Sequence, residues 1–169
     1  MTVTSTGRIF VNFPRWTEDS PISVAELNPI TGEVSAYPPN SQWNSWRNSN
    51  NKGLDPSAHF ICVQSVIAHP NGRSVWVLDP AAPALGFLVS NGPKLVEIDL
   101  ETNQTRRIIL FNDTIAPQGT YLNDVRFYDS YAYITDSGIT GALIVVDLNN
   151  GQARRLLHGH PSTQSDPTV

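Results

Sequence analysis

The chain has 169 residues, a mass of 18.6 kDa and a formal net charge of −4, with 13 prolines, 11 glycines and only 15% charged residues. This acidic balance argues against a nucleic-acid partner, which would require a cationic stripe. No apolar run approaches the ~20 residues that span a bilayer, so no membrane is expected among the partners either. The single cysteine, Cys62, lies between apolar neighbours and is interpreted as a buried small hydrophobe.

The first unit of the chain, approximately residues 1–38, is rich in expected strands. Gly7–Phe13 alternates in polarity, and Val24–Leu27 and Val34–Tyr37 flank a turn that contains Gly32, which predicts a hairpin. The amino terminus has neither the basic start nor the apolar core of a signal peptide. The sequence therefore leaves the compartment unknown.

A polar loop, residues 38–57, follows this unit and contains Trp43 and Trp46. A loop of this length is either functional or disordered. The two tryptophans favour a segment that packs over another part of the protein, such as the mouth of a channel. The alternative, that both rings cap the side of the first unit, stays open.

Two further units, approximately residues 58–111 and 119–158, repeat one pattern. In each, an apolar strand ends in Asp (Asp79, Asp136), and a second strand ends in Asp-Leu before a polar turn, an Arg-Arg pair and more aliphatic residues. Long runs at helical spacing are absent. The strands expected here are Phe60–Ala68, Val75–Leu78, Leu95–Leu100, Thr105–Leu110, Asn123–Tyr128, Tyr131–Thr135, Leu143–Leu148 and Ala153–Leu157.

Repeats of four short strands every 40 to 50 or so residues are typical of β-propeller blades. The fold class predicted is therefore all-β, with four-stranded antiparallel blades in a single partial propeller domain and a polar tail at residues 159–169. Because Asp79 and Asp136 recur at matching positions, we expect both to accept backbone N–H bonds at blade turns rather than to act in catalysis. Asp99 and Asp147 recur in the same way and are also interpreted as structural.

Several segments resemble the major royal jelly protein/Yellow family. The resemblance is carried by YLNDVRFYDSYAYITDSG (Tyr121–Gly138), GALIVVDLNNGQARRLL (Gly141–Leu157) and HGHPST (His158–Thr163), with weaker support from Trp76–Ala81 and Gly7–Trp16. It implies a six-bladed propeller, of which this sequence supplies about three blades. The family resemblance also implies an extracellular or periplasmic location.

The resemblance implies a module that binds a small organic ligand at the channel mouth. Trp43, Trp46 and Tyr121 would supply apolar contact, and Asn123 and Asp124 would supply orienting polar groups. An Asx pair that forms a turn is the structural alternative for Asn123 and Asp124. No residue is assigned to catalysis, and the chain alone is not expected to be an enzyme, although the sequence leaves enzymatic activity open.

Two other functions stay open. Related lactonase-type propellers hydrolyse lactones with a divalent cation, and Asn123 matches one of their metal ligands, so the chain could be a fragment of a gluconolactonase-like hydrolase that binds calcium or another divalent cation. The other interpretation is an inactive structural fragment. Because three blades do not close a ring, a homodimer that joins three blades to three is also expected as one way to complete it.

Overall fold

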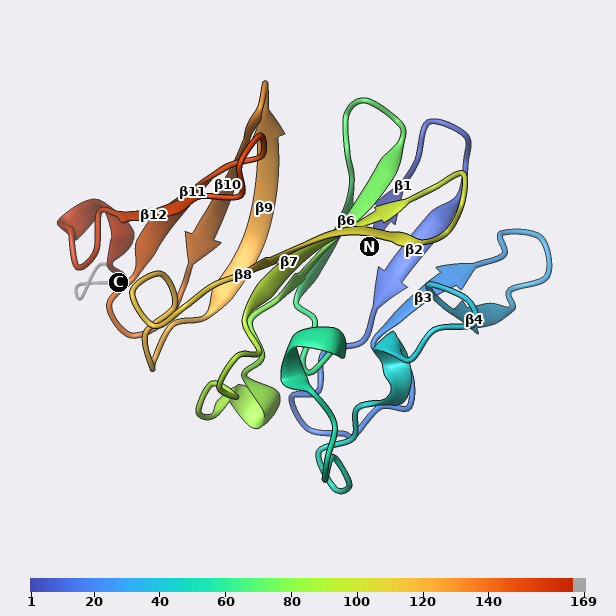
Figure 1. Ribbon diagram of the computed structural model, residues 1–169, viewed down its shortest axis with the longest axis horizontal. Helices are drawn as coiled ribbons and strands as arrows, with labels where there is room; N and C mark the ends of the chain where they lie inside the picture. Colours follow the sequence, from blue (N-terminus) through green and yellow to red (C-terminus); the bar gives the residue numbers. More distant parts are fainter. Residues whose placement is uncertain (166–169) are drawn as a thin grey trace.

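The computed structural model describes residues 1–165 and shows three four-stranded antiparallel sheets (Figure 1). Within each sheet the spatial order of the strands follows the sequence, so each sheet is a simple meander. The sheets are formed by β1 (Thr2–Val3), β2 (Ile9–Asn12), β3 (Val24–Leu27) and β4 (Val34–Ala36); by β5 (Ser65–Ala68), β6 (Ser74–Asp79), β7 (Lys94–Asp99) and β8 (Thr105–Leu110); and by β9 (Leu122–Tyr128), β10 (Tyr131–Asp136), β11 (Ala142–Asp147) and β12 (Ala153–Leu156).

Helix within residues 1–165 is confined to four short 3-10 turns: η1 (Trp43–Ser45), η2 (Pro56–Ala58), η3 (Pro83–Leu85) and η4 (Pro161–Thr163). None of them has the length and apolar character needed to cross a membrane. The prediction of an all-β chain built from blade-type sheets is therefore confirmed. We refer to the three sheets, in chain order, as the first, second and third blades.

Two strands differ from the sequence-based expectation. β5 begins at Ser65 and not at Phe60, because the N–H groups of Ile61 and Cys62 donate to the carboxylate of Asp79 at 2.7 and 3.0 Å. β1 is a two-residue strand that was not predicted, and it pairs Thr2 with Phe10. The last residues of the predicted tail, 166–169, lie outside the described part of the chain.

Apolar cores fill the spaces between neighbouring blades. The core between the first and second blades contains Phe10, Val24, Tyr37, Trp43, Phe60, Val63, Val66, Val75, Val77, Val96 and Ile98. The core between the second and third blades includes Trp76, Leu78, Leu95, Ile109, Leu122, Val125, Ala132, Ile134, Ile144 and Val146. Alternate residues of β6 thus face opposite neighbours, which explains why all six of its residues are buried.

The loops differ between the two ends of the blades. Short hairpin turns close β1–β2, β5–β6 and β9–β10 at one end, while the longer connections that contain η1, η2 and η3 gather at the other (Figure 1). The beginnings of β5 and β9 also lie at the end with the long loops. We call this end the mouth, and it is where the candidate site lies.

Asp79 and Asp136 anchor the mouth loops of the second and third blades. Asp79 accepts from Cys62 N and Ala81 N and pairs with the buried Lys94 at 3.1 Å. Asp136 accepts from Tyr121 N at 2.7 Å and Gly138 N at 2.8 Å, and it pairs with an arginine of β12, Arg155. The structural role predicted for both aspartates is confirmed.

Candidate functional site

A chain of side-chain hydrogen bonds connects the three blades at the mouth. Trp16 follows β2, and its Nε1 donates to the Tyr121 hydroxyl at 2.6 Å. That hydroxyl donates to Gln64 Oε1 at 3.0 Å, and Gln64 Nε2 donates to Asn123 Oδ1 at 2.9 Å. Trp16, Gln64 and Asn123 belong to three different blades, so the alignment of these groups depends on how the blades pack. We call these four residues the polar chain.

Gln64 and Asn123 lie near the starts of β5 and β9 in neighbouring blades. Val66 pairs with Val77 in the second blade, as Val125 pairs with Ile134 in the third. Before Val125 the register of the third blade shifts, so that Asp136 pairs with Leu122, and Asn123 lies in this irregular part of β9, where it accepts from Gln64.

A second side-chain contact joins the same two strands. Ser65 Oγ donates to Asp124 Oδ1 at 3.2 Å. Arg126 additionally pairs with Asp124 at 2.7 Å. The structure therefore places the predicted residues Tyr121, Asn123 and Asp124 together at the mouth, and it adds Gln64 and Trp16, which the sequence did not single out.

Tyr121 is the titratable residue of the polar chain. Burial raises the pKa of its phenol to about 12, and the hydrogen bond from Trp16 offsets part of that rise. The phenol is thus neutral across the physiological range. A neutral phenol can both accept a hydrogen bond and donate one, as it does between Trp16 and Gln64.

An apolar cleft lies directly beside the polar chain, with a volume of about 880 Å³. Its most prominent side chains, Phe87 and Ile139, are 87% and 85% exposed. None of the described residues that line it carries a charged side chain. The residues that line the cleft are Leu85, Gly86, Phe87, Gln118, Gly119, Thr120, Tyr121, Ser137, Gly138, Ile139 and Ser165.

Close backbone packing fixes the floor of this cleft. A Cβ on Gly138 would lie 2.1 Å from Gly119 O and 2.7 Å from Tyr121 N, so only glycine fits at this position. The neighbouring Thr120 is 5% exposed, and its Oγ1 has no hydrogen-bond partner among the described residues. Buried hydroxyls are nearly always satisfied, so Thr120 Oγ1 is an exception among the described residues, buried next to the cleft.

Trp43 and Trp46 lie in the protein interior and do not line the cleft. Trp43 stacks on Phe60 with ring centroids 4.7 Å apart, and its Nε1 donates to Thr105 Oγ1. Trp46 is 3% exposed and packs in a small cluster with Ile61, Cys62 and Ala81. Ligand contact by these two rings stays a prediction, and the site described here does not use them.

The oxygen atoms near Asn123 can be compared with the needs of a calcium ion. Calcium takes six to eight oxygen ligands, with carboxylates among them. Asn123 Oδ1 already accepts from Gln64, and the Asp124 carboxylate pairs with Arg126. Within residues 1–165, no group of three or more His, Cys, Asp or Glu residues could hold a metal ion. The described residues alone do not make up a calcium site, and the metal role of Asn123 stays a prediction.

Comparison with protein families explains the repeated sheets. The family model described as major royal jelly protein matches residues 67–169, which is more than half of the chain. The chain belongs to the major royal jelly protein family. No curated protein matches the sequence.

In this major royal jelly protein, most of the candidate site falls inside the matched region. The match includes Tyr121, Asn123 and the whole cleft, whereas Trp16 and Gln64 precede it. The hydrogen bonds of the polar chain therefore join the matched region to the part of the chain that precedes residue 67. One sequence signal for Gln64 exists: aligning residues 64–66 with residues 123–125 places Gln64 opposite Asn123.

Proposed function

We propose that this propeller module binds a small, uncharged organic ligand in the cleft beside Tyr121. The observation that carries the proposal is the position of Tyr121, whose hydroxyl belongs to the polar chain while the residue also lines the cleft. Small-molecule sites combine an apolar surface with a few convergent polar groups, in volumes of roughly 300–1,000 Å³. The cleft, at about 880 Å³, has this composition and size.

The lining residues indicate the chemistry of the ligand. Phe87, Leu85 and Ile139 offer apolar surface to a flat or aliphatic body. The Tyr121 hydroxyl donates its proton to Gln64, so it offers a remaining lone pair that accepts a hydrogen bond from a hydroxyl of the ligand. Because none of the described residues that line the cleft is charged, an ionised ligand would lose its hydration without a compensating partner among them. A neutral molecule with an aromatic body and one hydroxyl group fits best.

Binding of 2-naphthol, measured by isothermal titration calorimetry at neutral pH, tests this function. We expect saturable binding with one site per chain, and weaker binding of the charged analogue 2-naphthoate. Replacement of Tyr121 by Phe removes one hydrogen-bonding hydroxyl, worth about 1 kcal/mol, and should weaken binding about fivefold.

Tyr128→Phe is the matched control, because Tyr128 ends β9 away from the mouth and is 76% exposed. It should bind 2-naphthol as the unmodified protein does. Equal affinity for 2-naphthol and 2-naphthoate, or equal weakening by the two Tyr→Phe changes, would contradict the proposed site.

A further inference from the structure

One arginine contact recurs at both junctions between blades. Arg8 of the first blade lies over the Phe10 ring with 5.1 Å between Cζ and the ring centroid, pairs with Glu26 at 2.7 Å, and donates to Leu100 O of the second blade at 2.8 Å. This set joins an arginine, an aromatic ring and a glutamate of one blade to a turn carbonyl of the next.

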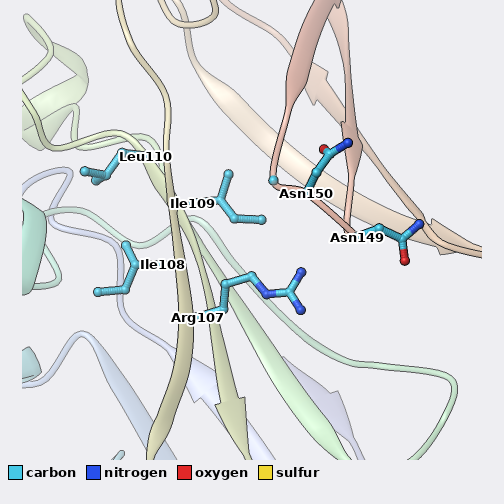
Figure 2. Close-up of a pocket in the computed structure, with 7 residues that line it drawn as sticks. Arg107, Ile108, Ile109, Leu110, Asn149 and Asn150 are labelled. Carbon is cyan, nitrogen blue, oxygen red and sulfur yellow. The ribbon is translucent and has the colours of Figure 1, made fainter.

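The second junction uses the same components. Arg107 lies 6.0 Å from the centroid of Trp76, pairs with Glu97 at 3.6 Å and donates to Leu148 O of the third blade. Figure 2 shows Arg107 extending from β8 toward Asn149 and Asn150 in the turn that follows Leu148. The register makes the two aromatic residues equivalent, since Phe10 is paired with Glu26 and Trp76 with Glu97.

The third blade carries this donor arrangement on a face that no described residue covers. Tyr133 pairs with Val145, and Val145 with Arg154, in the same register in which Trp76 pairs with Glu97 and Glu97 with Arg107. Tyr133 and Arg154 are therefore the equivalents of Trp76 and Arg107. The Arg154 side chain is exposed and forms no ion pair or hydrogen bond with residues 1–165, and the glutamate is replaced by Val145.

The first blade carries the matching acceptor turn, also uncovered. Asn28 N bonds to Glu33 O and Gly32 N to Asn28 O, as Asp99 N bonds to Gln104 O and Asn103 N to Asp99 O. Pro29 is therefore the equivalent of Leu100 and Leu148, the two acceptor residues. Glu33 occupies the position that is Gln104 in the second blade and Gln152 in the third. The third blade has Val145 in place of Glu97 and so lacks a carboxylate beside Arg154, whereas the turn of the first blade offers the carboxylate of Glu33.

The two uncovered faces both carry apolar side chains that could pack against each other. The outward face of the third blade shows Tyr133, Leu143, Val145 and Leu156. The outward face of the first blade has Ile9, Val11, Leu27, Val34 and Ala36 around the fully buried Ala25, and four of its residues, Ile9, Val11, Ala25 and Leu27, match the buried Val75, Val77, Val96 and Ile98 of the second blade. The outward face of the first blade thus resembles a face that already packs on a preceding blade.

We propose that two copies of this chain associate head to tail, the third blade of each packing on the first blade of the other. Arg154 of one copy then donates to Pro29 O and pairs with Glu33 of the second copy. Two such contacts, related by a twofold axis, cover the outward faces of both copies. The polar rim of this contact gives it charge specificity, while the aliphatic faces supply the buried area.

Light scattering coupled to size exclusion tests this association by charge exchange. The unmodified chain should have a mass of twice 18.6 kDa. Arg154→Glu and Glu33→Arg each place like charges together and should weaken the dimer about tenfold or more. The double variant restores an opposite pair and should dimerise within a few-fold of the unmodified chain.

Lys52→Glu is the control, because Lys52 is exposed in the loop between η1 and η2 and its replacement changes the net charge by the same amount as Arg154→Glu. It should leave the dimer intact, and near-ultraviolet circular dichroism should show that every variant keeps its tertiary packing. A folded monomer at all concentrations would assign these faces to a different partner and overturn the proposal. A dimer that neither single reversal weakens, or a mass that keeps growing with concentration, would also overturn it.

Discussion

The hydroxyl of Tyr121 occupies a position that only a neutral phenol fits well. It accepts from Trp16 and donates to Gln64, and an ionised oxygen could not donate. Burial raises the pKa of Tyr121 to about 12, and burial likewise raises the pKa of Tyr37 to about 12. Both phenols lie between blades, so their ionisation reports the packing of the blades.

Absorbance titration of the five tyrosines tests these two positions. Because the folded pKa of Tyr121 is raised above the ordinary value of about 10, its contribution to stability is complete below pH ~10 and is lost as the pH rises through about 12. Tyr121→Phe should therefore remove one phenol from the group that ionises near pH 12. Loss of a phenol that ionises near pH 10 would contradict the buried position.

Asp79 and Lys94 form an ion pair in which both side chains are fully buried, at 3.1 Å. Burial lowers the pKa of Lys94, and the charge of Asp79 opposes that effect. Asp79 also accepts three backbone N–H bonds, from Ile61, Cys62 and Ala81. Its removal would therefore leave both a buried cation and buried donors without partners.

Asp79→Ala should lower the free energy of unfolding by about 3–5 kcal/mol, as measured by urea titration. Asp99→Ala is the matched control, since Asp99 holds a more exposed turn through Glu101 N and Thr102 N and should lose only about 1 kcal/mol. Similar losses in the two variants would be incompatible with the proposed anchoring role of Asp79.

For single residues, the sequence predicted the roles of recurring positions better than the roles of positions that occur once. Asp79 and Asp136 stood out because each ends the equivalent strand, and both accept backbone N–H bonds as expected. Gln64 and Trp16 did not stand out, because their contacts to Asn123 and Tyr121 join residues 59 and 105 positions apart. Contacts of that kind depend on blade packing and leave no periodic signal.

At the scale of single elements, strands with period-two alternation were predicted well. In β11 the buried and partly buried residues alternate strictly, which fits a sheet with a packed face and an open face. β5 was predicted too long because Phe60–Val63 is as apolar as a strand, yet the N–H groups of Ile61 and Cys62 bond to Asp79. Apolar composition alone does not separate a buried loop from a buried strand.

The turn at Gly138 is the element on which the cleft depends most. Gly138→Ala would place a methyl group against Gly119 O and Tyr121 N, so we expect a loss of about 1–3 kcal/mol in the free energy of unfolding and weaker 2-naphthol binding. Gly86→Ala is the comparison, because its Cβ would meet only Pro83 O at 3.3 Å. Thermal unfolding of both variants measures the difference, and equal melting temperatures would refute this account of the floor.

At the scale of the whole molecule, the repeated pattern was sufficient to predict the blades but not how the blades pack against one another. Each four-stranded unit could be recognised because its turns and Asp-Leu pairs recur. The burial of Trp43 could not be recognised, since it stacks on Phe60 and bonds Thr105 of another blade. Tryptophans in a long polar loop look alike in sequence whether they lie at a mouth or in a core.

The mouth is likewise a property of the whole molecule. Trp16, Gln64 and Asn123 come from three blades and meet only when all three pack together. Ligand binding should therefore depend on the integrity of both blade junctions, and not on the third blade alone.

Backbone-amide NMR of the chain titrated with 2-naphthol tests the central claim most directly, because it locates the ligand without assuming its site. The account predicts saturable chemical-shift changes concentrated at Phe87, Tyr121 and Ile139, with smaller changes at Gln64 and Asn123 through the polar chain. Absence of saturable changes, or changes centred on the outward faces of the first and third blades, would contradict it.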